Sequence, residues 1–117
     1  MTNVMENHVS MPLHTPEQLR EHAGEACALL KALANEDRLM LLCCIGASRR
    51  NVSELEAATG INQPTLSQQL AVLRQEGLVA TEKEGKYIYY RLVDANAMRV
   101  MGTLWEIFCA PACASRP

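Results

Sequence analysis

The chain has 117 residues, of which 49% are hydrophobic and 21% are charged; this composition is typical of one globular domain and excludes a disordered chain. No apolar run approaches the roughly 18 residues that a membrane-spanning helix needs, and the first residues lack the apolar core of a secretory signal, so we expect a cytoplasmic protein. The net charge of −2 argues mildly against a nucleic-acid partner, because basic groups dominate affinity for phosphates.

The patterns along the chain predict three segments. Residues 1–14 show no sustained period and are expected to form a flexible arm. Residues 15–110 contain the periodic patterns and are expected to form a single domain. Residues 111–117 begin with a proline, which ends a helix, and we expect them to fray.

A capping box predicts where the first helix begins. Thr15 stands at the N-cap, Pro16 at the first helical position and Gln18 at the position that completes the box. The helix is expected to run to about Ala34, and Cys27 is interpreted as packing within it. The predicted buried stripe of this helix consists of Leu19, Ala23, Ala26, Leu30 and Leu33.

Asn35 is expected to cap a second helix, because its side chain can accept a hydrogen bond from the first turn. That helix is largely apolar and is expected to end at Gly46. Residues 48–51 are expected to form a polar loop. A short third helix then begins at Ser53 and ends at Gly60.

The next helix carries the most informative pattern of the chain. Asn62 is expected to cap it, with Pro64 in its first turn, where a missing N–H costs little. Leu66, Leu70 and Leu73 recur at i, i+4 and i+7 and predict a narrow buried stripe. Small polar residues near the helix start then lie mostly outward, where they can hydrogen-bond base edges in a DNA major groove. This layout resembles a DNA-binding helix-turn-helix; the alternative is an ordinary helical hairpin with a solvated polar face.

After Leu78 the sequence changes from a helical period to alternation. Residues 78–92 predict two strands around the turn Glu84-Gly85-Lys86. A hairpin directly after a reading helix is typical of a winged helix, and its basic residues predict phosphate contacts; the alternative is simple solvation of an exposed hairpin.

The helix and the hairpin together supply a set of predicted DNA-binding residues. We expect the basic members of this set to share one surface with Arg49 and Arg50. The predicted set is Gln63, Thr65, Ser67, Gln68, Gln69, Arg74, Lys83, Lys86 and Arg91.

A last helix is expected from the N-cap Asp94 to Cys109. Its apolar residues cover more than one face, which is more buried surface than one small domain needs. We therefore expect this helix to pack against a second subunit, although packing in the core of one chain is the competing interpretation.

The order of these elements resembles the ArsR/SmtB family of dimeric winged-helix repressors. The resemblance is carried by LLKALANEDRLMLL at residues 29–42, by VSELEAATGINQPTLSQQLAVLRQEGLV at residues 52–79, and by the YIYYRL strand. It implies a mainly α, winged helix-turn-helix fold, homodimeric through the first and last helices, that binds double-stranded operator DNA. Gln69 stands where the family usually has histidine, which implies an altered base preference.

Members of this family commonly sense metals, but the ligands expected for such sites are missing. No cysteine lies near Leu55-Glu56-Ala57, where one type of site would need it, and the last helix has Asp94 and Glu106 but no histidine. The three histidines, His8, His14 and His22, are scattered in the first part of the chain, where they are more often solvated than ligating. We predict no metal site and no cofactor.

The cysteines indicate a different sensor. LMLLC, ending at Cys43, and WEIFC, ending at Cys109, resemble the persulfide-responsive, BigR/SqrR-like subgroup of the family. That resemblance implies that the two thiols react with sulfane sulfur and become linked, and that the linked protein releases DNA. Such a linkage requires that folding bring the thiols within bonding reach.

Three alternatives to this sensor remain. The two cysteines can be inert core thiols, since cysteine is often buried. A thiophilic metal can be the signal, with soft ligands from Cys43, Cys44, Cys109 and Cys113. A thiol enzyme is a remote third possibility, because Cys109 ends a helix, where the dipole disfavours a thiolate, and no histidine accompanies either cysteine in the sequence.

Overall fold

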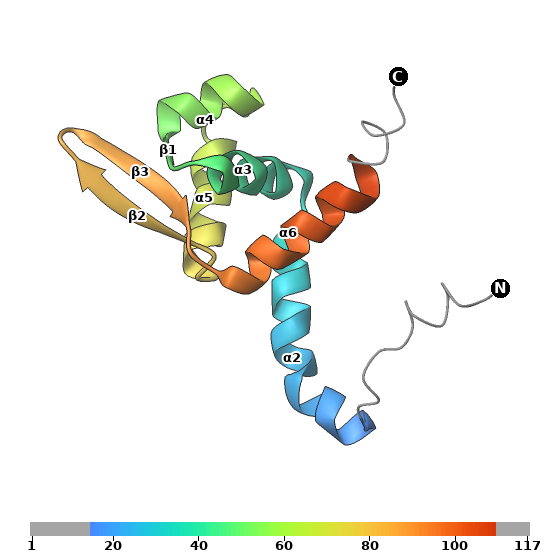
Figure 1. The fold of residues 1–117 in the computed structure, drawn as a ribbon. Helices are drawn as coiled ribbons and strands as arrows, with labels where there is room; N and C mark the ends of the chain where they lie inside the picture. Colours follow the sequence, from blue (N-terminus) through green and yellow to red (C-terminus); the bar gives the residue numbers. More distant parts are fainter. Residues whose placement is uncertain (1–14, 110–117) are drawn as a thin grey trace, which may run out of the picture. The chain divides into compact units, whose positions relative to one another are not determined.

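The computed structural model describes residues 15–109 as a mainly helical fold with a small sheet (Figure 1). The chain divides after Leu30 into two units. No helix among the described residues is both long and apolar enough to cross a membrane. The predicted arm and tail, residues 1–14 and 111–117, lie outside the described residues. The elements are α2 (Pro16–Leu33), α3 (Glu36–Ala47), β1 (Arg50–Asn51), α4 (Val52–Thr59), α5 (Thr65–Gln75), β2 (Val79–Glu84), β3 (Tyr87–Leu92) and α6 (Ala95–Phe108).

The first unit consists of most of α2, and its predicted start is confirmed. The Thr15 hydroxyl accepts a hydrogen bond from the Gln18 amide at 3.1 Å, and the Gln18 side chain accepts one from the Thr15 amide at 2.9 Å. The predicted apolar stripe of this helix is buried only at its last residue, Leu33, whereas Leu19 and Leu30 are exposed. Cys27 is exposed as well, so the interpretation of this residue as helix packing is wrong: none of the described residues covers its side chain.

The core of the second unit is built around α3, which packs against α4, α5, α6 and β3. Asn35 caps this helix as predicted, with its side chain accepting a hydrogen bond from the Arg38 amide at 3.0 Å. The helix ends at Ala47, one residue beyond the predicted Gly46. Its buried residues are leucine and isoleucine side chains that meet those of α4 and α5. The largest fully buried side chains of the unit are Leu41, Leu42, Ile45, Leu55, Leu66, Leu70 and Leu73.

The predicted hairpin is confirmed, and a third strand joins it. β2 and β3 pair antiparallel from Val79↔Leu92 to Glu84↔Tyr87, and the turn between them contains Gly85 at φ 65°, a conformation that favours glycine. β1 pairs with the other edge of β3, giving the strand order β1-β3-β2. Part of the predicted loop at residues 48–51 is therefore a strand, because Arg50 and Asn51 find pairing partners far along the chain.

The two helices of the helix-turn-helix begin differently from the prediction. α4 starts at Val52, one residue before the predicted Ser53, with Asn51 as its N-cap. α5 starts at Thr65, so Asn62 is not its N-cap. Pro64 stands at the N-cap and makes no side-chain hydrogen bond. The Ser67 amide of the first turn donates to the Gln63 side chain at 3.1 Å instead of to an Asn62 side chain.

α6 begins as predicted, since the Asp94 side chain accepts a hydrogen bond from the Asn96 amide at 3.2 Å. Ala97 is the buried residue of this helix. Cys109 follows as its C-cap, with its amide donating to the Trp105 carbonyl at 2.8 Å. Most of the apolar surface of α6 is thus not buried within the described chain.

Candidate nucleic-acid interface

The outward face of α5 carries the residues expected to read DNA. Ser67 and Gln68 are exposed and Thr65 is half-buried, while Leu66 and Leu70 on the opposite face are buried. This division follows from the helical period, which places residues three and four apart on the same face. Ser67 and Gln68 therefore stand in the first turns of the helix with side chains free to meet base edges.

Gln69 is not an outward residue, contrary to the expectation. It is half-buried, and its side-chain oxygen accepts a hydrogen bond from Nη1 of Arg38 at 2.7 Å. Gln63 is also engaged, through its hydrogen bond to the Ser67 amide. Of the four glutamine and serine side chains predicted to contact DNA, Ser67 and Gln68 remain exposed without a side-chain bond among the described residues.

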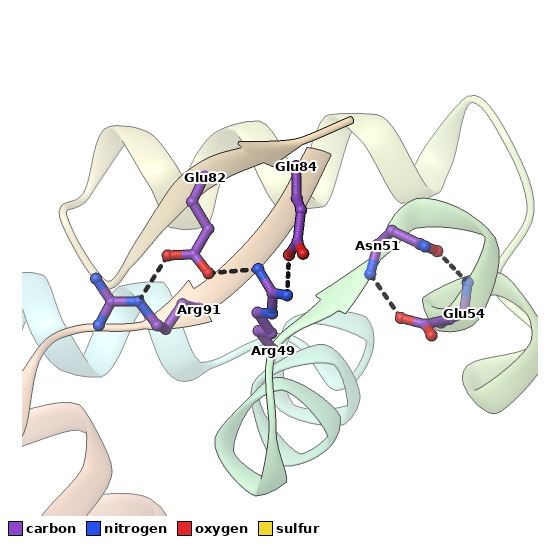
Figure 2. A network of polar contacts seen from close by, with 6 residues as sticks. All are labelled: Arg49, Asn51, Glu54, Glu82, Glu84 and Arg91. Carbon is purple, nitrogen blue, oxygen red and sulfur yellow. Dashed lines mark hydrogen bonds and ion pairs between the residues drawn. The ribbon is translucent and has the colours of Figure 1, made fainter. Parts of the chain in front are cut away.

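The wing carries a network of charges that sequence reasoning missed (Figure 2). Arg49 donates to Glu82 at 2.7 Å and to Glu84, and its guanidinium lies 4.2 Å from the centre of the Tyr89 ring. Glu82 also pairs with Arg91 at 3.5 Å. The hydrogen bonds to Glu84 and then Glu82 raise the pKa of Arg49 further above its usual value, so this residue is fully charged at physiological pH.

This network makes the basic surface smaller than the sequence suggested. Arg49 and Arg91 are paired with carboxylates, and Arg50 is half-buried in β1. Within residues 15–109, the exposed side chains of Arg74, Lys83 and Lys86 form no ion pair. These are the basic residues of the predicted set that remain available to phosphate.

The sequence indicates the acidic part of this network but not its cation. Glu82 and Glu84 are two residues apart on a strand, so their side chains lie on the same face of the sheet. Two adjacent carboxylates on one face repel each other unless a cation lies between them. Arg49 fills that place, although its position before β1 gives no local indication of it.

The two cysteines of the predicted sensor lie on helices that pack against each other. Cys43 is exposed on α3, Cys109 is half-buried at the end of α6, and both are free thiols; α3 and α6 are in contact. Cys44 is half-buried beside Cys43, and Cys113 lies outside the described residues. In the region from 15 to 109, no three histidine, cysteine or acidic side chains come together as metal ligands would.

Comparison with known proteins identifies the family. Residues 35–81 match the bacterial regulatory proteins of the arsR family. The biofilm growth-associated repressor of Agrobacterium fabrum is 50% identical over 93 residues, which cover 80% of each chain. The crystal structure of the repressor BigR from Xylella fastidiosa superposes with a TM-score of 0.77 at 46% identity, covering 82% of this chain and 98% of that one. Reduced HlyU from Vibrio cholerae gives a TM-score of 0.75 at 35% identity, covering 80% and 98%.

The helix pair, the exposed start of α5 and the wing thus define a winged helix-turn-helix transcriptional regulator, not an enzyme. The chain belongs to the ArsR family of bacterial regulatory proteins, and it is a DNA-binding transcriptional repressor of the BigR type.

Proposed function

We propose that this repressor is a homodimer that leaves its operator when reactive sulfur species link Cys43 to Cys109. The observation that carries the proposal is the packing of α3 against α6, with a free cysteine thiol on each helix. Exposure of Cys43 makes it accessible to a small reagent, as a reacting thiolate must be. Because the protein acts on DNA, we place it in the bacterial cytoplasm.

The linkage forms in two balanced steps. One thiolate attacks the outer sulfur of a low-molecular-weight persulfide, which gives a protein persulfide and releases the carrier as a thiol. The second thiolate then attacks the protein-bound sulfur of that persulfide, so that Cys43 and Cys109 become joined and hydrogen sulfide leaves. The persulfide is the oxidant, and no metal is needed.

Linking these cysteines acts on the helix that supports the reading helix. α3 packs against α5 as well as against α6, so fixing α3 to the end of α6 restricts the positions that α5 can adopt. A switch of this kind needs to favour the released state by only a few kcal/mol to empty an operator.

The dimer is supported by apolar surface that the described chain leaves uncovered. Phe108 is 73% exposed and Trp105 is 52% exposed, although large aromatic side chains on one helix face are seldom left to solvent. The exposed Leu19 and Leu30 of α2 form a second such surface. We propose that a second copy of the chain covers α2 and α6, as isologous dimers do with matching patches.

In the proposed complex the start of α5 enters the major groove of operator DNA. Ser67 and Gln68 reach base edges, with Thr65 beside them, and these contacts carry the sequence preference. Arg74 on the helix and the wing residues Lys83 and Lys86 contact phosphate and fix the register. Two reading heads in a dimer then recognise two half-sites about one helical turn apart.

The test is the response of single cysteine variants. Cys43→Ser and Cys109→Ser are expected to bind operator DNA as the wild type does, but to stay bound when a low-molecular-weight persulfide is added. Cys27→Ser is the matched control, since it removes an exposed thiol from α2 and is expected to release DNA normally. Release by either of the first two variants at the wild-type persulfide concentration contradicts the sensor.

Intact-mass measurement distinguishes the inducers. Wild-type protein is treated in parallel with persulfide, peroxide and a small disulfide. Only persulfide is expected to change the mass, by formation of the internal Cys43–Cys109 linkage with or without added sulfur atoms, and an equal change with peroxide contradicts selectivity for persulfide. Stoichiometric binding of zinc, cadmium or arsenite with DNA release, and no reaction with persulfide, favours the metal alternative instead.

A further inference from the structure

Arg38 joins three elements around the reading helix. Its Nε donates to the Ala32 carbonyl at 2.6 Å, its Nη2 to the Lys31 carbonyl at 3.0 Å, and its Nη1 to the Gln69 side chain at 2.7 Å. Lys31 and Ala32 belong to the last turn of α2, Arg38 to the first turn of α3, and Gln69 to α5. A single guanidinium group thus connects the end of one helix to the side chain of another.

Each of these bonds has a physical reason to persist. The last carbonyls of a helix have no partner within the helix, and Arg38 supplies donors to two of them. The guanidinium is planar and permanently charged, so its donors keep a fixed spread that an ammonium group does not have. Arg38 itself is held at the start of α3, where its amide donates to the Asn35 cap at 3.0 Å.

The bond to Gln69 fixes the direction of that side chain. A guanidinium can only donate, so the amide of Gln69 must turn its oxygen toward Arg38. Recognition of adenine by glutamine needs both the oxygen and the nitrogen of the amide aimed at one base edge. An oxygen held 2.7 Å from Arg38 does not meet this need, whereas the neighbouring Gln68 is exposed and free to do so.

We infer that Arg38 and Gln69 form a positioning pair that sets the orientation of α5, and that Gln69 affects operator binding through this pair and not by reading a base. The inference rests on the proposed DNA-reading role of α5. It also deepens the proposed switch, since Arg38 and Cys43 lie on the same helix. A movement of α3 relative to α5 must strain or break the Arg38 bond to Gln69.

Base preference is the measurement that separates a positioning role of Gln69 from a base-reading role. The probe is a duplex that the wild-type dimer selects from a randomised library long enough for two half-sites one helical turn apart. Gln69→Leu keeps a side chain of similar size but removes the acceptor, and it is expected to weaken binding roughly tenfold. The loss is expected to be even across all single-base substitutions of the duplex. Gln68→Leu is the contrast, because loss of a reader relaxes the preference at particular base pairs.

Two further variants check that the effect passes through Arg38. The double variant carries Arg38→Met and Gln69→Leu. Its operator affinity is expected to be at most about twofold lower than that of the weaker-binding single variant, since both substitutions remove the same bond. Gln69→Glu keeps an acceptor for the guanidinium and is expected to keep the wild-type base preference. Gln69→Leu changes no charge, and Gln69 is not expected to contact phosphate, so the salt dependence of binding is expected to be unchanged in this variant.

The outcomes that overturn the inference differ from those that overturn the proposed function. If Gln69→Leu loses its preference at one particular base pair, Gln69 reads that base. Losses of affinity that add up in the double variant also contradict the positioning pair. If Arg38→Met does not fold, the comparison of Gln69→Leu with Gln69→Glu still decides, because equal loss of base preference in both contradicts a positioning role. Failure of the wild type to select any duplex overturns the DNA-reading proposal itself.

Discussion

Arg49 lies between the end of α3 and the start of β1, and its guanidinium meets Glu82 and Glu84 of the wing. Without this cation, Glu82 and Glu84 would present two carboxylates on β2. Both flank Lys83, which is expected to contact phosphate. We therefore expect Arg49 to support DNA binding without contacting DNA, because its charge neutralises Glu82 and Glu84 on the wing. The face of Tyr89 covers the guanidinium at 4.2 Å, a cation–π contact that helps to hold it in place.

We predict that Arg49→Gln weakens operator binding severalfold, because repulsion between Glu82, Glu84 and phosphate then opposes the complex. The free energy of unfolding is expected to change little, since the pairs are exposed and screened by water. Binding isotherms and urea denaturation measure the two effects. Arg20→Gln, an exposed arginine of α2, is the control for lost charge; equal losses of affinity in both variants contradict the prediction.

Alkaline pH is not a means of breaking this network. The hydrogen bonds that Arg49 donates to Glu84 and Glu82 raise the pKa of Arg49. A group whose pKa is higher in the folded chain contributes stability below its unfolded pKa and loses it only as the pH passes the folded value. That window lies far above neutrality, so salt, which screens exposed charges, is the practical way to weaken the pairs.

At the scale of elements, the start of α4 is fixed by a capping box (Figure 2). The Asn51 side chain accepts from the Glu54 amide at 2.9 Å, and the Glu54 side chain accepts from the Asn51 amide at the same distance. Asn51 is buried and also belongs to β1. One residue therefore ends a strand and begins a helix.

We predict that Asn51→Ala lowers the free energy of unfolding by about 1 to 2 kcal/mol, because it removes the N-cap acceptor and leaves the Glu54 amide without its partner. Urea denaturation followed by circular dichroism gives the value. Ser53→Ala, at an exposed position of the same turn, is expected to cost no more than a few tenths of that. Equal destabilisation by the two substitutions contradicts a specific role for the cap.

The elements that the sequence predicted well depend on local interactions. The caps at Thr15, Asn35 and Asp94 are confirmed, because a cap bonds within its own helix turn. β1 was missed because its pairing with β3 joins segments far apart in the chain. The start of α5 was misplaced at Asn62 because Gln63 supplies the acceptor instead, and sequence alone does not rank two neighbouring polar residues.

In the candidate site, too, the features that depend on local interactions were predicted and those that depend on distant residues were not. The exposure of Ser67 and Gln68 followed from the helical period of the buried leucines. The inward direction of Gln69 did not, because it depends on Arg38 from another helix. Likewise, the pairing of Arg49 with the wing arises only when the loop before β1 meets the sheet.

For the whole molecule, the largest consequence comes from the uncovered apolar face of α6. We predict that Trp105→Glu, at a position 52% exposed, converts the proposed dimer to a monomer, because the dimer would bury an unpaired carboxylate. Analytical ultracentrifugation measures the state of association. Operator affinity is expected to fall at least about a hundredfold, since two linked reading heads bind far more tightly than one.

Asn96→Glu is the matched control, because Asn96 is exposed on the first turn of the same helix, where a carboxylate suits the dipole. This variant is expected to remain dimeric. A Trp105→Glu protein that sediments like the wild type, with intact operator binding, places the dimer contact elsewhere.

The sharing of Asn51 between β1 and α4 has a mechanical consequence. No linker separates the sheet from the helix pair at this point, since β1 ends at Asn51 and α4 begins at Val52. If phosphate contacts the wing as proposed, a force on the hairpin passes through β1 into the first turn of α4. The angle at which the wing meets DNA in the proposed complex therefore constrains the tilt of α4, because the two share this junction.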